Sequence, residues 1–264
     1  MKNHERNMMR HLKNDFPEDG TPISLPDMNR IWKVWMPVGF VLLLVALFLW
    51  RQQGIDEAVL FHYNPARLAG DPLVILSKWL TSYGMAFITA ILILYLVVSQ
   101  WNKSLDAPLT IYLYTISSFA MSGIAGDLLK QVFARPRPAA AFGDAIFALS
   151  QATSQAFPSG HATKSVALAI PFIFLVSNSK NIHKAIKALI ALVAVGVCFS
   201  RIVLAAHYVS DVVAGIGVAL IGLPLTMLFA NMILKRMKVE QLPAASKKWG
   251  IILVGLTIIF VFIF

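Results

Sequence analysis

The chain has 264 residues, of which 58% are hydrophobic and only 14% are charged, and its mean hydropathy is +0.69. This composition excludes a water-soluble domain and indicates an integral membrane protein. The formal net charge of +10 does not indicate a nucleic-acid partner, because in a membrane protein the basic residues must first be assigned to loops.

A polar N-terminal tail, residues 1–30, precedes a series of apolar runs. The runs that are long enough to cross a bilayer as helices lie near 34–50, 80–100, 109–129, 162–178, 186–203 and 209–233. The sequence therefore predicts an all-α, polytopic membrane helix bundle with six core transmembrane helices over residues 31–234. A basic loop and a shorter apolar run, a candidate seventh span at 249–264, complete the chain over residues 235–264.

The third predicted span ends in KQVFARPRP, residues 130–138. This motif places the three cations Lys130, Arg135 and Arg137 beside two prolines at a membrane boundary. Asp127 precedes Lys130 by three residues on the same helix face, so we interpret it as the ion-pair partner of Lys130. Arg135 is interpreted as a headgroup or surface contact.

The segment AAAFGDAIFALSQA, residues 139–152, follows this motif and carries Phe142, Ile146, Phe147 and Leu149 at roughly helical spacing. We expect an interfacial segment beside the lipid entrance, with a plain surface loop as the alternative.

The fourth span is preceded by FPSGHATKS, residues 157–165. Pro158, Ser159 and Gly160 are turn and cap residues, so a helix is predicted to begin there with His161 in its first turn. The unpaired N–H groups and the dipole of such a helix end favour an anion. Lys164, about one turn further on, either reaches a second phosphate of a diphosphate substrate or extends to the membrane interface.

The apolar stretch from Ala188 to Leu234 is too long for one span. As one helix at 1.5 Å per residue it would be roughly 70 Å long, whereas a bilayer core is about 30 Å thick. Its polar interruption is SRIVLAAHYVSD, residues 200–211, so the chain is predicted to reverse there. His207 and Asp211 then share one helix face at an i, i+4 spacing.

Basic residues are unevenly divided between the two sides of this topology. If the N-terminus is cytoplasmic, its side holds 15 Lys and Arg residues and the opposite side holds 8. Cytoplasmic segments carry the excess of basic residues, so the N-terminus is predicted to be inside. The three polar motifs then meet at the extracytoplasmic face of the membrane, which we interpret as a bacterial inner (plasma) membrane.

This arrangement can bring together three cations, two imidazoles, one carboxylate and a helix N-terminus. The residues are Lys130, Arg137, Ser159, His161, Arg201, His207 and Asp211. A doubly charged oxyanion such as phosphate suits this set, because Arg offers a planar fork and Lys a point charge to its oxygens.

The three motifs, complete and in this order, resemble the signature of the type 2 phosphatidic acid phosphatase family, which includes lipid phosphate phosphatases and vanadium haloperoxidases. The resemblance covers about residues 55–232. It implies that His207 attacks phosphorus to form a phosphohistidine, while Asp211 fixes the tautomer of His207. His161 would protonate the leaving oxygen and then activate water. The phosphoryl oxygens would be held by Lys130, Arg137, Arg201, Ser159 and the N–H of Gly160.

The sequence thus predicts a membrane phosphatase that hydrolyses a lipid phosphate or diphosphate, with polyprenyl diphosphate slightly preferred. No cofactor is expected, and three adjacent cations would repel a metal ion. The expected partners are the lipid phosphate substrate and membrane lipids. Two alternatives stay open: a lipid phosphotransferase that uses the same histidine, and a non-enzymatic anion or lipid transporter.

Overall fold

The computed structural model describes residues 31–63, 70–99, 109–146, 154–176, 178 and 180–236. Within these ranges the chain forms helices and connecting loops, with no strand, so the predicted all-α class is confirmed. The predicted tail over 1–30 and the additional apolar run at 249–264 lie outside the described residues.

Six helices of the described ranges overlap, in order, the six predicted spans. They are α3 (Met36–Gln52, continuous with the π-helical turn η1, Ile31–Trp35), α5 (Pro72–Ser99), α6 (Leu109–Phe133), α8 (Gly160–Leu175), α9 (Asn181–Val203) and α10 (Val209–Arg236). Shorter elements are α4 (Gly54–Tyr63), α7 (Pro138–Phe142) and the 3₁₀ turn η3 (Gly143–Ala145).

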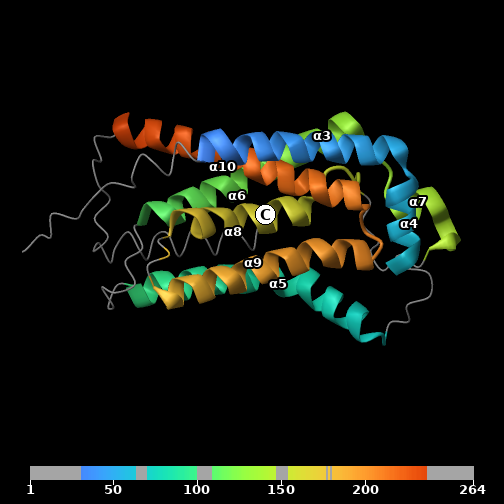
Figure 1. Cartoon of the computed structure of the whole chain (residues 1–264), viewed down its shortest axis with the longest axis horizontal. Helices are drawn as coiled ribbons and strands as arrows, with labels where there is room; N and C mark the ends of the chain where they lie inside the picture. The colour runs from blue at the N-terminus through green and yellow to red at the C-terminus, as the bar shows by residue number, and fades with distance from the viewer. Residues whose placement is uncertain are drawn as a thin grey trace, which may run out of the picture.

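Four helices of the described residues are long and apolar enough to cross a membrane. They are Ile31–Gln52, Pro72–Ser99, Asn181–Val203 and Val209–Met232. The apolar helix α8 is shorter, at 16 residues, and runs alongside them in the bundle (Figure 1).

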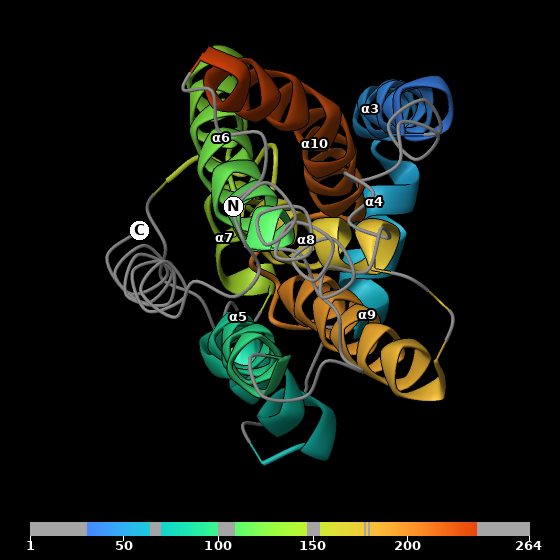
Figure 2. The same cartoon turned by 90° about the vertical axis from the view of Figure 1, so that its left-hand side faces the viewer.

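Helix α8 lies inside the bundle, where it packs against α6, α9 and α10. Helix α3 packs on the outer side of α10, and α5 packs on α9, as the view along the bundle shows (Figure 2). Small side chains allow this close packing, since Ala162, Ala167 and Ala169 of α8 are buried. Their burial holds α8 close to the neighbouring helices.

The helix ends that carry the three motifs lie at one end of the bundle, where α4 and α7 also lie (Figure 1). Helix α9 ends at Val203 and α10 begins at Val209, so the predicted reversal within residues 200–211 is confirmed.

Two features at this end differ from the prediction. Helix α5 begins at Pro72 rather than near residue 80, because the carboxylate of Asp71 accepts a hydrogen bond from the Leu73 N–H at 2.8 Å and caps the helix. The sequence analysis also did not predict α4, which follows the first span and packs against α3, α9 and α10.

Candidate active site

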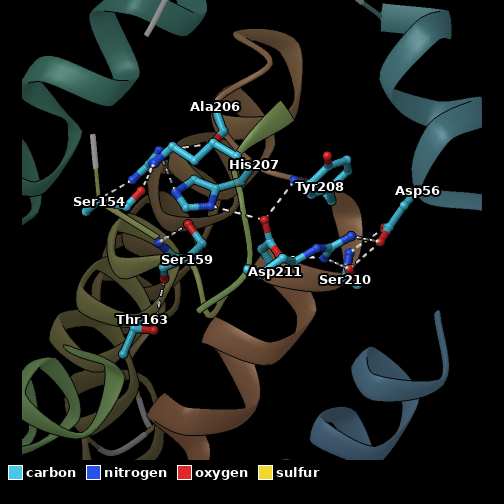
Figure 3. A network of polar contacts seen from close by, with 12 residues as sticks. Asp56, Ser154, Ser159, Thr163, Ala206, His207, Tyr208, Ser210 and Asp211 are labelled. Carbon is cyan, nitrogen blue, oxygen red and sulfur yellow. Dashed lines mark hydrogen bonds and ion pairs between the residues drawn. The ribbon is translucent and has the colours of Figure 1, made fainter. Parts of the chain in front are cut away.

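The N-terminus of α8 has the cap that the PSGH motif, residues 158–161, predicts. Ser159 is the N-cap, and its hydroxyl accepts a hydrogen bond from the Ala162 N–H at 3.5 Å. Its carbonyl oxygen accepts two bonds from Thr163, and its own N–H donates to the carbonyl oxygen of Asp211 at 2.9 Å. The start of α8 is therefore joined to the first turn of α10 by the backbone (Figure 3).

His207 and Asp211 face each other in the predicted pairing. The Nδ1 atom of His207 lies 3.3 Å from Oδ2 of Asp211, and the same oxygen accepts the N–H of Tyr208 at 3.0 Å. Both side chains are buried. Because an ionised carboxylate can only accept a hydrogen bond, Nδ1 carries the proton and donates, so the lone pair of the imidazole is on Nε2.

Arg137 lies directly in front of that nitrogen, with its Nη1 atom 3.3 Å from Nε2 of His207. Its position is fixed by bonds to the carbonyl oxygen of Ala206 at 3.0 Å and to the carbonyl and hydroxyl oxygens of Ser154 at 2.6 and 2.9 Å. Burial lowers the pKa of Arg137 from its ordinary value, and the charge of Asp211 acts in the opposite direction. Arg137 therefore presents a positive charge beside an unprotonated imidazole nitrogen.

Arg201, in the last turn of α9, brings a second buried guanidinium to the site. Its side chain donates to the hydroxyl of Thr81 at 3.1 Å, and its Nε atom has no hydrogen-bond partner among the described residues. Only 4% of Arg201 is exposed, so this donor is also withdrawn from solvent. A buried cation with an unused donor favours an anionic ligand.

Lys130 lies against the start of α8. A Cβ atom added to Gly160 would be 3.1 Å from Nζ of Lys130, so the glycine leaves room for the ammonium group. Lys130 also pairs with Asp127 at 3.0 Å, which confirms the predicted ion pair. The partly exposed His161 follows Gly160 and interacts electrostatically with Arg201, among other groups.

Lys164 packs against α6 and also acts electrostatically on His161. Its Cε atom would be 3.1 Å from a Cβ atom on Gly123, and its ammonium group lies 5.9 Å from the ring centre of Phe119. Phe119 lies about 16 Å from Lys130 along the axis of α6, at a rise of 1.5 Å per residue.

The interpretation of Arg135 as a headgroup or surface contact is wrong. The residue is 4% exposed and donates to Asp56 at 2.8 Å and to Asp211 at 2.6 Å. Its guanidinium carbon also lies 3.9 Å from the ring centre of Tyr208 and 5.1 Å from that of Trp50. Arg135 is held within the protein because two carboxylates balance its charge and two rings cover it.

Sequence reasoning missed four polar residues that hold the site together. They are Asp56, Thr81, Ser154 and Ser210. Only Asp56 had a signal in the sequence. The three motifs contain more cations than carboxylates, so a further carboxylate outside them could be expected as a partner. Thr81 and Ser154 lie outside the motifs and have no charge that would distinguish them from other hydroxyl residues.

The comparisons with known proteins concern the family and the fold of the chain. Residues 111–237 match the model of the PAP2 superfamily. The chain is also similar to the solved structure of the first transmembrane PAP2 type phosphatidylglycerolphosphate phosphatase from Bacillus subtilis, with a TM-score of 0.56 and 24% sequence identity over 75% of this chain and 96% of that chain. A search of curated proteins returned no match.

The fold and the long apolar helices define an integral membrane protein. Residues 111–237, which contain all three motifs, are a PAP2 superfamily segment, so the family predicted from the sequence is confirmed.

Proposed function

We propose that this protein is a membrane phosphatase that hydrolyses a lipid phosphate or diphosphate through a phosphohistidine on His207. One observation carries the proposal. Nε2 of His207 faces the guanidinium of Arg137 at 3.3 Å, and Nδ1 lies 3.3 Å from the carboxylate of Asp211. An imidazole oriented by a carboxylate and aimed at a cation is suited to attack an anionic phosphorus centre.

The first chemical step forms a bond between Nε2 of His207 and phosphorus and breaks the bond from phosphorus to the leaving oxygen. His161 supplies the proton that the leaving oxygen takes up. The ring of His207 then carries a positive charge, which Asp211 stabilises through Nδ1. In the second step His161 removes a proton from water, the water oxygen attacks phosphorus, and His207 leaves as the neutral imidazole.

The phosphoryl oxygens are held by cations and by the start of α8. Arg137 and Arg201 are buried and form no ion pair among the described residues, so both are available to a phosphate. Lys130, Ser159 and the N–H of Gly160 complete this binding set. The reaction is proposed to be metal-independent, because these groups supply the charge stabilisation that a metal ion would otherwise supply.

The substrate is proposed to be a lipid whose phosphate is presented at the extracytoplasmic face. The name of the Bacillus subtilis protein makes phosphatidylglycerophosphate one candidate. Phosphatidic acid and lipid A phosphates are others. We keep a slight preference for polyprenyl diphosphate, whose recycling needs an enzyme on this face.

The decisive experiment measures phosphate release by the purified protein from these four lipids, with and without EDTA. We expect release that persists in EDTA and is absent in His207→Ala. Release only after a metal ion is added would contradict the metal-independent mechanism. An inactive wild-type protein that still carries anions or lipids into proteoliposomes would instead support the transporter.

The phosphotransferase alternative is separated by the fate of the phosphate. With a radiolabelled lipid phosphate and a second lipid as acceptor, a phosphatase releases the label as inorganic phosphate. Appearance of the label on the acceptor lipid would show transfer in place of hydrolysis.

A further inference from the structure

A buried chain of alternating charges reaches the proposed nucleophile from outside the three motifs. It runs from Asp56 of α4 through Arg135 to Asp211, which holds His207 (Figure 3). Asp56 is 1% exposed and Asp211 is 0% exposed, so water does not screen these charges. The charges of these three groups therefore determine part of the electrostatic potential at the imidazole of His207.

Arg135 alone would weaken the support that Asp211 gives to His207. Its Nη1 atom donates to Oδ1 of Asp211 at 2.6 Å, while His207 uses Oδ2. A guanidinium and one carboxylate together have no net charge. With Asp56 bound to the other side of Arg135 at 2.8 Å, the three groups keep one net negative charge beside the imidazole. That charge is available when the ring of His207 becomes positive.

Asp56 also fixes the first turn of α10. Its Oδ1 accepts the backbone N–H of Ser210 at 2.9 Å, and its Oδ2 accepts the hydroxyl of Ser210. The N–H of Ser210 belongs to the first turn of α10, so a carboxylate from another helix acts there as its cap. The same turn carries Asp211, which is thereby held in place.

Apolar side chains of α4 pack against its neighbours and so position the carboxylate of Asp56. Leu60 is buried in a cluster with Ala205 and Tyr208, which precede and follow Ala206 and His207 in the chain. The ring of Phe61 lies 5.2 Å from that of Phe142 in α7. Helix α4 thus packs on the loop between α9 and α10, which carries His207, and holds Asp56 next to the first turn of α10.

We propose that Asp56 is a positioning residue for the reaction: it neutralises Arg135, so that Asp211 keeps a negative charge for His207, and it holds the first turn of α10. The inference rests on the proposed role of His207 as the nucleophile. It assigns a role in turnover to a residue that precedes the segment matched by the family model.

The first test is Asp56→Asn, which keeps the size of the side chain and removes its charge. We expect kcat to fall by about 10- to 100-fold with KM within about twofold, as for other groups that orient a reacting side chain. Glu57→Gln is the matched control, because it removes the same charge one residue further along α4. The control should keep the activity of the wild type, and equal losses in both variants would overturn the proposal.

The second test is the double variant Asp56→Asn/Arg135→Gln. It removes the uncompensated cation, so Asp211 regains its net negative charge. We expect the double variant to recover at least about fivefold in kcat over Asp56→Asn alone, a coupling typical of contacting groups. If Asp56 were only a structural support, the second substitution would leave kcat unchanged or lower it further.

Thermal unfolding of each variant in detergent accompanies the kinetics. If Asp56→Asn does not fold, the double variant carries the test, and a folded but inactive double variant overturns the proposal. The wild-type measurement is independent of these comparisons. Absence of phosphate release from the wild type would contradict the proposed function, whereas an active wild type with an unaffected Asp56→Asn would contradict only this inference.

Discussion

At the scale of single residues, the two histidines of the site have unlike surroundings. His207 pairs with a carboxylate through Nδ1 and is buried, whereas His161 lies in the first turn of α8 and is partly exposed. A histidine oriented by a carboxylate suits nucleophilic attack, and a partly exposed one at a helix start suits proton exchange. Removing either side chain is therefore expected to impair a different step of the reaction.

His207→Ala should abolish phosphate release and the acid-labile phosphoenzyme together. His161→Ala should slow turnover severely, yet still form phosphohistidine from an aryl phosphate, whose leaving group needs no proton. Asp211→Asn should lose roughly 10² to 10⁴ in rate, by analogy with other carboxylate-oriented histidines. Acid-quench trapping with labelled substrate measures the intermediate. Phosphoenzyme in His207→Ala and none in His161→Ala would reverse the assignment.

The pH dependence should report the buried imidazole. Burial lowers the pKa of His207 from 6.5 to about 4, while the hydrogen bond and charge of Asp211 act in the opposite direction. The neutral, attacking form is present above that pKa and is lost as the pH falls through it. The acid limb of kcat/KM should thus lie near pH 4. Tryptophan fluorescence over the same range separates this titration from acid unfolding, and a limb near 6.5 in folded protein would contradict it.

At the scale of helices, the contact between α10 and α8 determines where the PSGH motif lies. A Cβ atom on Gly215 would come within 2.7 Å of the Ser159 carbonyl oxygen and 3.0 Å of the Ala162 Cβ. Ser159 also bonds to α10 through its N–H, so α8 cannot move away without losing that bond. The glycine therefore sets the distance between the two helices at the site.

Gly215→Ala should lower the free energy of unfolding by about 1–3 kcal/mol, as is usual for overpacking. It should also reduce kcat, because the start of α8 is displaced from His207. Thermal unfolding in detergent and phosphate release measure the two effects. Gly54→Ala is the matched control, since a Cβ atom there would meet no described atom within 4 Å. Equal effects of both substitutions would contradict the proposed role of the contact.

The helices and the local parts of the site could be predicted because their signals are local. Apolar runs of membrane length predict spans, and the cap residues Pro158, Ser159 and Gly160 predicted a helix start at His161, one residue after the observed start of α8 at Gly160. The contact between Arg135 and Asp56 could not be predicted in this way. It depends on how α4 packs on the bundle, and no spacing along the sequence encodes that packing.

At the scale of the whole molecule, the site lies at one end of the bundle, and the distribution of basic residues predicts which side of the membrane this end faces. Ala145, in η3, is exposed at the end that carries the site, and Lys180 precedes α9 at the opposite end. The one native cysteine, Cys198, is buried. A thiol introduced at either position can therefore be labelled over a low background.

Ala145→Cys should react with a membrane-impermeant thiol reagent in intact cells, and Lys180→Cys should react only after the membrane is opened. The reason is the excess of 15 over 8 basic residues on the side of the N-terminus. Labelling is measured by the mass shift of the purified protein, with the unsubstituted chain as background. The opposite pattern would place the site on the cytoplasmic side.

The backbone bonds around His207 also determine which changes in chain length the protein can tolerate. The carbonyl oxygen of Arg201 accepts the N–H groups of Ala206 and His207 at 3.0 and 3.2 Å, so the number of residues between Arg201 and His207 is fixed by a closed turn. The start of α8 is joined to the first turn of α10 by the bond from the Ser159 N–H to the carbonyl oxygen of Asp211. Insertions between α8 and α9, at the far end of the bundle, would leave all three bonds intact. Related chains can therefore diverge in length between the motifs while the third motif keeps its internal spacing.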